Sequence, residues 1–197
     1  MNVPPETYIR VSVSDLHNLI TSILNKVHVP AEDARIIADL MVDTDLRGVI
    51  SHGSQTLGGY FRWYQNGFTN PKPDTKIVKE TPVSVLVDGD GSLGHVATHM
   101  AVERAIEKTR KSGLCMAVTR NHAHFGSAGK YTRMIVKEGL IGFSVSGLCA
   151  RLPEDRSTSS WAHHPLDNCP LSFGFPAQEG YPVIADMCSS VMDEWDV

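Results

Sequence analysis

Two short segments of this sequence place histidine beside glycine and small polar residues. They are residues 47–53 (Arg-Gly-Val-Ile-Ser-His-Gly) and 121–126 (Asn-His-Ala-His-Phe-Gly), and each lies between stretches typical of regular structure. The unperturbed pKa of histidine lies near neutrality, so such a side chain can give or take a proton at working pH. Two histidines of this kind on loops indicate an enzyme.

His52 is the candidate acid–base residue of the first segment. When a 2-oxo acid is reduced by hydride transfer, its carbonyl oxygen gains a proton, and an imidazole within hydrogen-bond reach can supply it. The Ser51 hydroxyl could orient the imidazole or the substrate oxygen, and a carboxylate distant in sequence, such as Asp186, could fix the tautomer. The spacing leaves an alternative open, in which His52 is only a histidine at the end of a helix.

The second segment also has two interpretations. His122 and His124 are two residues apart, so an extended backbone could present both to a metal ion, with His163 and His164 as partners. No third ligand follows at a suitable spacing, and we predict no metal site. We prefer the interpretation that residues 125–128 (Phe-Gly-Ser-Ala) open a helix whose free N–H groups accept a phosphate or carboxylate.

A glycine-rich segment, residues 89–94 (Gly-Asp-Gly-Ser-Leu-Gly), matches the G-x-G-x-x-G pattern of Rossmann dinucleotide sites. The next predicted strand ends at Thr119-Arg120 instead of at an acid that could hold a ribose hydroxyl. We therefore interpret the segment as a tight turn between a strand and a helix.

Apolar spacing predicts a helical first part followed by alternating strands and helices. Ser14 is the expected cap of the first helix, the second starts near Pro30, and Gly67 follows the third. We predict a mixed α/β fold, with an N-terminal helical segment (1–75) and a mixed sheet covered by helices (76–197). The expected helices run from the Ser14 cap to about residue 27, from near 30 to 45–48, over 55–66, from about 95 to 111 and over 127–137, and the expected strands are 83–87, 114–119, 140–146 and 182–185.

The bulk composition is that of an ordinary globular protein. The chain has 197 residues, a formal charge of −4 and no long basic run, so nucleic acid is not an expected partner. It shows no membrane-spanning apolar run and no signal-peptide pattern, so we expect a cytoplasmic protein without a membrane partner. No cysteine pair forms a Cys-x-x-Cys motif, and reduced thiols are expected at Cys115, Cys149, Cys169 and Cys188.

Five motifs in a fixed order carry a family resemblance, which runs from about residue 8 to residue 191. The chain resembles the malate/L-lactate/L-sulfolactate dehydrogenases, a family that also holds ureidoglycolate dehydrogenase and imino-acid reductases. Five ordered motifs are far more specific than any one of them. The motifs are residues 45–53 (DLRGVISHG), 87–94 (VDGDGSLG), 121–129 (NHAHFGSAG), 169–176 (CPLSFGFP) and 184–190 (IADMCSS).

The resemblance implies a homodimeric oxidoreductase that transfers hydride between NAD or NADP and a small 2-hydroxy acid, on a non-Rossmann cofactor-binding fold. It implies His52 as the proton donor and acceptor, Ser51 as its neighbour and Asp186 as the relay carboxylate. His124 would lie near the reacting centre, and Ser189 close to the cofactor. The implied cofactor contacts are His124, Phe125, Gly126, Ser127 and Ala128.

The chain departs from the family in three respects. Thr56 stands at the substrate-binding position where the family usually has an arginine, and threonine cannot form the two-pronged bond of a guanidinium with a carboxylate. Arg47, Arg62 and Arg120 are candidate substitutes. Residues 147–168 do not follow the family pattern. Family members also continue beyond this length, so residues 76–197 would form an incomplete cofactor-binding domain.

Two further functions stay open at this stage. The first is a truncated, inactive relative that acts as a dimerising or ligand-binding module, and failure to bind NADH and NADPH would support it. The second is a metal-dependent hydrolase using His122, His124 and His163, which would require stoichiometric metal in the purified protein.

Overall fold

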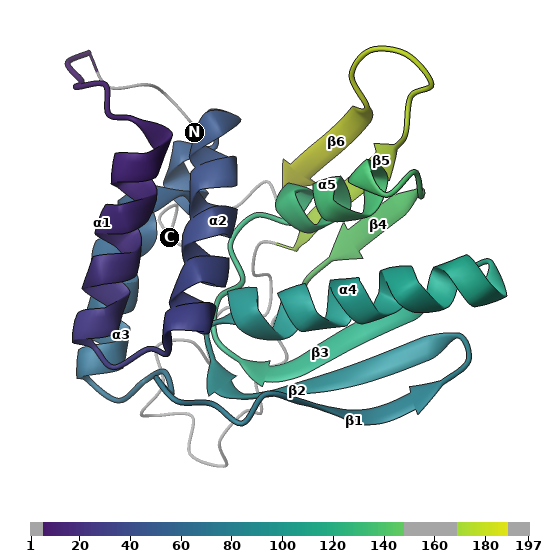
Figure 1. Ribbon diagram of the computed structural model, residues 1–197, viewed down its shortest axis with the longest axis horizontal. Coiled ribbons are helices and arrows are strands. Elements are labelled where there is room, and N and C mark those ends of the chain that lie inside the picture. Colours follow the sequence, from purple (N-terminus) through teal and green to yellow (C-terminus); the bar gives the residue numbers. More distant parts are fainter. Residues whose placement is uncertain (1–5, 148–168, 189–197) are drawn as a thin grey trace.

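The computed structural model describes residues 6–147 and 169–188. Three helices form the N-terminal part (Figure 1): α1 (Val13–Lys26), α2 (Ala31–Leu46) and α3 (Leu57–Gln65). Two single 3₁₀ turns, Ile50–His52 and Ser54–Thr56, join α2 to α3. The helical character predicted for this part is confirmed.

The ends of these helices have local causes. Ser12, and not the predicted Ser14, caps α1, because its Oγ accepts the Asp15 N–H at 3.0 Å. Our choice of Ser14 was wrong by two residues, since both serines precede the apolar run and only one has the extended backbone of a cap. Pro30 occupies the cap position of α2. Gly67, with φ +72°, follows α3 as predicted.

One apolar core joins the three helices to the start of the next one. Fully buried side chains such as Ile20, Ile37 and Met41 pack with Tyr60 of α3 and with Leu93, which precedes α4 (Gly94–Ser112). Because Leu93 belongs to this core, the position of α3 and of the turns before it depends on where α4 begins. The division of the chain at residue 75 stays a prediction.

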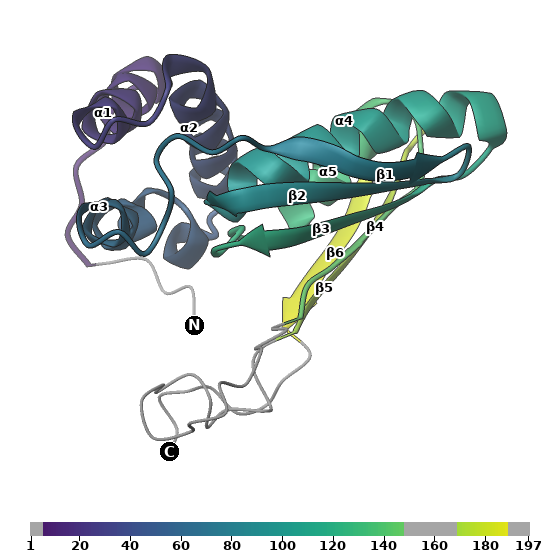
Figure 2. The ribbon, with the colours of Figure 1, turned by 90° about the horizontal axis from the view of Figure 1, so that it is seen from below.

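The first sheet contains β1 (Lys76–Thr81), β2 (Ser84–Ser92) and β3 (Met116–His122), in that order. β1 is antiparallel to β2, whereas β2 and β3 are parallel and are connected through α4. Val85 and Val87 pack under Ala97 and Ala101 of α4, which lies along one face of the sheet (Figures 1 and 2). β1 was not predicted, because all six of its residues are exposed and it lacks the alternation that marks a half-buried strand.

The second sheet contains β4 (Gly142–Val145), β5 (Pro170–Phe175) and β6 (Val183–Cys188), all antiparallel, and α5 (Gly129–Lys137) packs against it. Gly174 lies so close to α5 that an added Cβ would be 2.5 Å from Thr132 Cγ2. The mixed α/β class is confirmed, although the described strands form two sheets instead of one. β5 was not predicted.

The space beside the glycine-rich segment is filled by other residues of the chain. β2 continues through it to Ser92, and α4 begins at Gly94, whose N–H donates to the carbonyl oxygen of His124 at 3.0 Å. An added Cβ at Gly94 would lie 2.6 Å from the Cβ of Phe125. The start of α4 is therefore covered by residues 123–125, and no space remains there for the pyrophosphate of a Rossmann site.

A partly buried ion pair ties α2 to α5. Arg133 donates from Nε and Nη2 to Oδ2 of Asp43, at 2.8 and 2.6 Å. We predict that Asp43→Asn lowers the free energy of unfolding by about 1.5–3 kcal/mol, because Arg133 would lose its charge-assisted bonds while staying largely buried. The matched control is Asp39→Asn on the same helix, an exposed acid whose removal should cost at most ~1 kcal/mol. Urea unfolding of both variants measures the difference, and equal losses would contradict the prediction.

No helix in the described part of the chain is long and apolar enough to cross a membrane.

Candidate active site

His52 lies in the 3₁₀ turn just after α2. Asp45, near the C-terminal end of α2, fixes the position of this turn. Asp45 Oδ2 accepts the Ser54 N–H at 2.9 Å. The Asp45 carboxylate also fills the space beside Gly53, where an added Cβ would lie 1.8 Å from Oδ1. Ser51 Oγ and Nδ1 of His52 are 2.9 Å apart, so these two residues are hydrogen-bonded, as expected for neighbours in one mechanism.

His124 faces His52 from a different part of the chain. It lies just beyond β3, and the two imidazole centroids are 5.6 Å apart. Tyr60 of α3 positions the second ring, because its hydroxyl lies 2.7 Å from Nδ1 of His124. Both histidines remain accessible: His52 is half-buried, and His124 keeps an exposed edge. A ligand oxygen between them could contact both rings.

Two buried groups lie behind this pair. His95 of α4 is fully buried, and neither of its ring nitrogens has a hydrogen-bond partner within the described residues. Lys130 of α5 is 1% exposed, and its Nζ likewise has none. Both approach Gly126, where an added Cβ would lie 2.1 Å from Nζ of Lys130 and 3.1 Å from Nε2 of His95. Buried side-chain nitrogens of Lys130 and His95, without hydrogen-bond partners among the described residues, therefore lie behind the two accessible imidazoles.

Asp186 comes from β6, and its carboxylate lies against the backbone of Gly129 at the start of α5. An added Cβ at Gly129 would be 2.4 Å from Oδ2, and the Gly129 N–H bonds to the carboxylate. Asp186 acts on His52 through space, and the structure contains no hydrogen bond or ion pair between these two side chains. The predicted relay carboxylate is thus near the predicted base, and Ser51 is the group that contacts its ring.

Residues 125–128 are buried, and their side chains differ in what they contact. The Phe125 ring stacks on Tyr131 at 5.3 Å between centroids, and Ala128 lies in the same apolar cluster. Ser127 Oγ is buried without a hydrogen-bond partner among the described residues. Of the predicted cofactor contacts, His124 and Ser127 therefore have side-chain polar atoms to offer. Ser189 lies outside the described residues.

Thr56 and Arg120, one of the three candidate arginines, already have hydrogen-bond partners within the chain. The Thr56 hydroxyl donates to the carbonyl oxygen of Gly53 at 2.8 Å. Arg120 is committed to Asp88, with Nε 2.9 Å from Oδ2. Arg47 lies in the first segment with its Nε 3.9 Å from Asp43 Oδ1, and Arg62 lies in α3.

The structure gives no support for binding of a metal by the second segment. Both ring nitrogens of His122 lie in hydrogen-bond range of protein oxygens, 2.8 Å from Ala123 O and 2.8 Å from Thr119 Oγ1. No group of three or more His, Cys, Asp or Glu side chains suited to a metal ion occurs within residues 6–147 and 169–188. His163 and His164 lie outside the described residues.

The pKa values follow from burial and from the positive charge behind the site. Burial lowers the pKa of His52, the Lys130 ammonium lowers it further, and the Asp186 carboxylate opposes both. Burial also lowers the pKa of His124, followed by the effects of His52 and Lys130. Burial raises the pKa of Tyr60 to about 12, so its hydroxyl keeps its proton. Both imidazoles are therefore neutral at pH 7.

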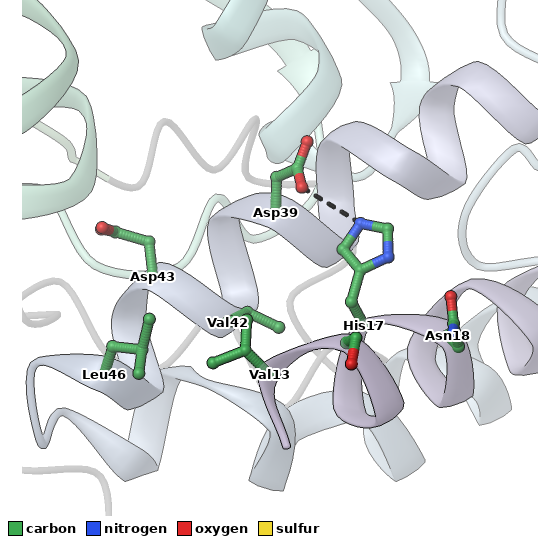
Figure 3. A pocket seen from close by; sticks show the side chains of 8 residues that line it. Val13, His17, Asn18, Asp39, Val42, Asp43 and Leu46 are labelled. Atoms are coloured by element: carbon green, nitrogen blue, oxygen red, sulfur yellow. Dashed lines mark ion pairs between the residues drawn. The ribbon is translucent and has the colours of Figure 1, made fainter.

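A groove elsewhere on the surface does not belong to this site. It lies between α1 and α2, has a volume of about 670 Å³ and holds the ion pair between His17 Nε2 and Asp39 Oδ1, 3.0 Å apart (Figure 3). It contains none of the site residues described above. Its lining residues are Val13, Ser14, His17, Asn18, Asp39, Val42, Asp43 and Leu46.

Comparison with known proteins decides the family. The family model for malate/L-lactate dehydrogenase matches residues 11–196, nearly the whole chain. The chain belongs to this family. Malate dehydrogenase of Pyrococcus abyssi is 35% identical over 187 residues, which are 95% of this chain and 50% of the relative. L-sulfolactate dehydrogenase of Methanocaldococcus jannaschii is 44% identical over 128 residues, 65% of this chain and 37% of the relative. The chain thus spans about half the length of the curated relatives it matches.

Solved structures of the same family also match the fold of this chain. The structure of malate dehydrogenase from Pyrococcus horikoshii OT3 matches with a TM-score of 0.80 at 34% identity, covering 96% of this chain and 53% of that one. The sulfolactate dehydrogenase structure from Methanocaldococcus jannaschii also gives a TM-score of 0.80, at 34% identity. The resemblance identified from five motifs is confirmed, and these relatives are dehydrogenases of small hydroxy acids by name.

Sequence reasoning missed three residues of the site. Tyr60, His95 and Lys130 were not predicted as site residues. Lys130 carried no clear signal, because Arg133 and Lys137 follow it at helical spacing and the sequence gives no reason to single it out from them. His95 carried none, because its contacts come from segments distant in the sequence.

Proposed function

We propose that this chain carries the acid–base half of an NAD- or NADP-dependent 2-hydroxy acid dehydrogenase, with His52 as the proton donor and acceptor. One observation carries the proposal: two accessible imidazoles, His52 and His124, come from distant parts of the chain and face each other with their ring centroids 5.6 Å apart. The Asp186 carboxylate acts electrostatically on His52. The names of the relatives favour malate, sulfolactate or lactate as substrates. A homodimer and a cytoplasmic location are part of the same proposal.

Two polar groups fit a nicotinamide cofactor. The buried Ser127 hydroxyl has no partner in the described part of the chain, and a carboxamide or phosphate oxygen could satisfy it. The exposed edge of His124 could stack on or bond to the nicotinamide. When bound, the cofactor would accept hydride from the substrate or donate it. Titration of the chain with NADH and NADPH, followed by fluorescence, tests this part directly, and binding of neither would favour the inactive ligand-binding or dimerising module instead.

In the proposed mechanism, His52 takes the proton of the substrate hydroxyl when the hydroxy acid is oxidised, and it returns a proton to that oxygen when the oxo acid is reduced. Its Nδ1 is bonded to Ser51, so Nε2 is the nitrogen available to the substrate. The Tyr60 hydroxyl keeps its proton, and in the tautomer proposed here it donates a hydrogen bond to Nδ1 of His124, so that the ring proton of His124 lies on Nε2. His124 would then donate a hydrogen bond to the same substrate oxygen. The Asp186 carboxylate favours the imidazolium that forms on His52.

The pH dependence of hydroxy acid oxidation tests the role of His52. Oxidation requires neutral His52, and the pKa of this residue is lowered from its ordinary value of 6.5. The base is therefore present above that lowered pKa and is lost as pH falls through it. We predict that kcat/KM for oxidation falls tenfold per pH unit on the acid side, with a midpoint below 6.5. Steady-state rates at saturating cofactor measure this, and a midpoint at or above 6.5 would contradict the assignment.

A further inference from the structure

Lys130 is a buried ammonium group without a counterion in the described part of the chain. It lies in the first turn of α5, its side chain is 1% exposed, and its Nζ makes no hydrogen bond to the described residues. The nearest aromatic contact is Tyr131, whose ring centroid is 5.6 Å from Nζ. Burial of an unpaired charge is costly, so such a lysine is retained where a partner completes it.

The carboxylates of Asp43 and Asp186, whose charges act on Lys130, are hydrogen-bonded to other groups. Asp43 receives two charge-assisted bonds from Arg133, the shorter at 2.6 Å. Asp186 lies against Gly129 and accepts its N–H. Neither forms an ion pair with Lys130 among the described residues. The ammonium therefore lacks a partner in the chain as described.

The surroundings of Nζ are rich in nitrogen on the side of the candidate site. Nζ fills the space beside Gly126, and His95 Nε2 approaches the same space. Neither nitrogen of the His95 ring has a partner within the described residues. The Lys130 charge acts on His52 and His124 as well as on His95. This arrangement repels cations and attracts an anion into the space near the two accessible imidazoles.

We propose that Lys130 is the countercharge of the ligand carboxylate, with His95 as a neighbouring hydrogen-bond donor. The identity of the acid, a 2-oxo or 2-hydroxy acid, rests on the proposed function. Lysine suits this role because its ammonium is a compact charge on a flexible four-carbon stem, so it can turn from Gly126 toward an entering carboxylate. Lys130 would thereby select acids over neutral ketones and alcohols.

Protonation of Lys130 adds a second readout. Burial, followed by the Arg133 charge, lowers the pKa of Lys130 to about 7, against the opposing effect of Asp43 and Asp186. A carboxylate stabilises the charged form, so its affinity should fall as pH rises above about 7. The charged and titratable groups that face this lysine are His95 on α4, His52 and His124 on the loops, Asp43 on α2, Arg133 on α5 and Asp186 on β6.

The test compares oxamate, an unreactive 2-oxo acid analogue, with neutral oxamide and inorganic phosphate. Binding is measured by calorimetry at pH 6.5, with and without NADH. We expect Lys130→Met to weaken oxamate binding by roughly 30-fold or more, the loss usual when one partner of a buried charge pair is removed, and to leave oxamide binding unchanged. Lys137→Met, an exposed lysine of the same helix, is the matched control and should change neither.

The unmodified chain supplies an independent measurement that does not depend on how Lys130→Met folds. Oxamate binding at pH 8.5, in two buffers of different ionisation enthalpy, should take up a proton, because binding charges a lysine that is mostly neutral when free. Absence of oxamate binding, a Lys130→Met effect below about twofold, no proton uptake, or Lys130-dependent binding of phosphate in place of oxamate would each overturn the proposal. His52→Gln should abolish turnover and still bind oxamate in preference to oxamide. Turnover therefore tests the proposed function, whereas oxamate binding tests the role of Lys130.

Discussion

His52→Ala should lower kcat/KM for hydroxy acid oxidation by roughly 10²–10⁴-fold, the usual contribution of a general acid–base group. The imidazole is half-buried, and its hydrogen bond within the described residues is to the hydroxyl of the exposed Ser51, so its removal leaves no deeply buried polar group there unsatisfied. We therefore expect the circular dichroism spectrum and the melting temperature to change little. Steady-state assays with the cofactor that the chain binds measure the loss.

The matched control is His99→Ala, which removes a partly buried histidine of α4 that is not one of the site residues. His99 pairs with Glu103 at 3.4 Å, and its side chain is 22% exposed. This variant should keep turnover within about twofold of the parent chain, since His99 pairs with the exposed Glu103 and an ion pair of this kind contributes little. A His52→Ala variant that retains most of its activity would remove His52 from the mechanism.

Gly94→Ala should destabilise the chain by about 1–3 kcal/mol, the cost of an extra methyl group in a well-packed contact. Its Cβ would lie 2.6 Å from the Cβ of Phe125, 2.7 Å from the carbonyl oxygen of Ala123 and 2.8 Å from Nδ1 of His122. Backbone and short side chains cannot yield as a long flexible chain would. The loop that carries His124 must then move away from α4, so activity should fall together with stability.

Gly59→Ala is the matched control for this substitution. Gly59 lies inside α3, and nothing lies within 4 Å of its added Cβ. Alanine is favoured over glycine in a helix interior by roughly 0.5–1 kcal/mol, so this variant should be slightly more stable than the parent chain. Denaturant unfolding measures both. Equal stability changes in the two variants would show that the contact between α4 and residues 122–125 is looser than described.

The elements that the sequence predicts well are those whose own residues determine them. The apolar spacing of α1 to α3 and Gly67 after α3, which has φ +72°, are local signals, and they predicted these helices to within a few residues. The exposed strand β1 has no such signal, because it is held by its pairing with β2 and by the bonds of Glu80 to α4, which residue types do not reveal. The partition into two sheets likewise depends on contacts between strands far apart in the sequence.

The same distinction holds for the site. His52 and His124 could be chosen from their loops, whereas their 5.6 Å separation depends on how α4 and the N-terminal helices pack. Lys130 and His95 become functional candidates only when burial and missing partners are known. Asp186 was chosen through the family resemblance, and its bond to the Gly129 N–H could not be read from residue types.

The most direct test of the central claim is an NMR titration of the His52 ring in the free chain and with oxamate bound. We predict a pKa below 6.5 in the free chain, because burial and Lys130 disfavour the imidazolium, and a clear rise of that pKa when the anionic ligand contacts the ring. At a fixed pH, addition of oxamate should leave the resonances of His99 unchanged. An ordinary pKa at His52 that the ligand leaves unchanged would contradict the assignment of the proton to this imidazole.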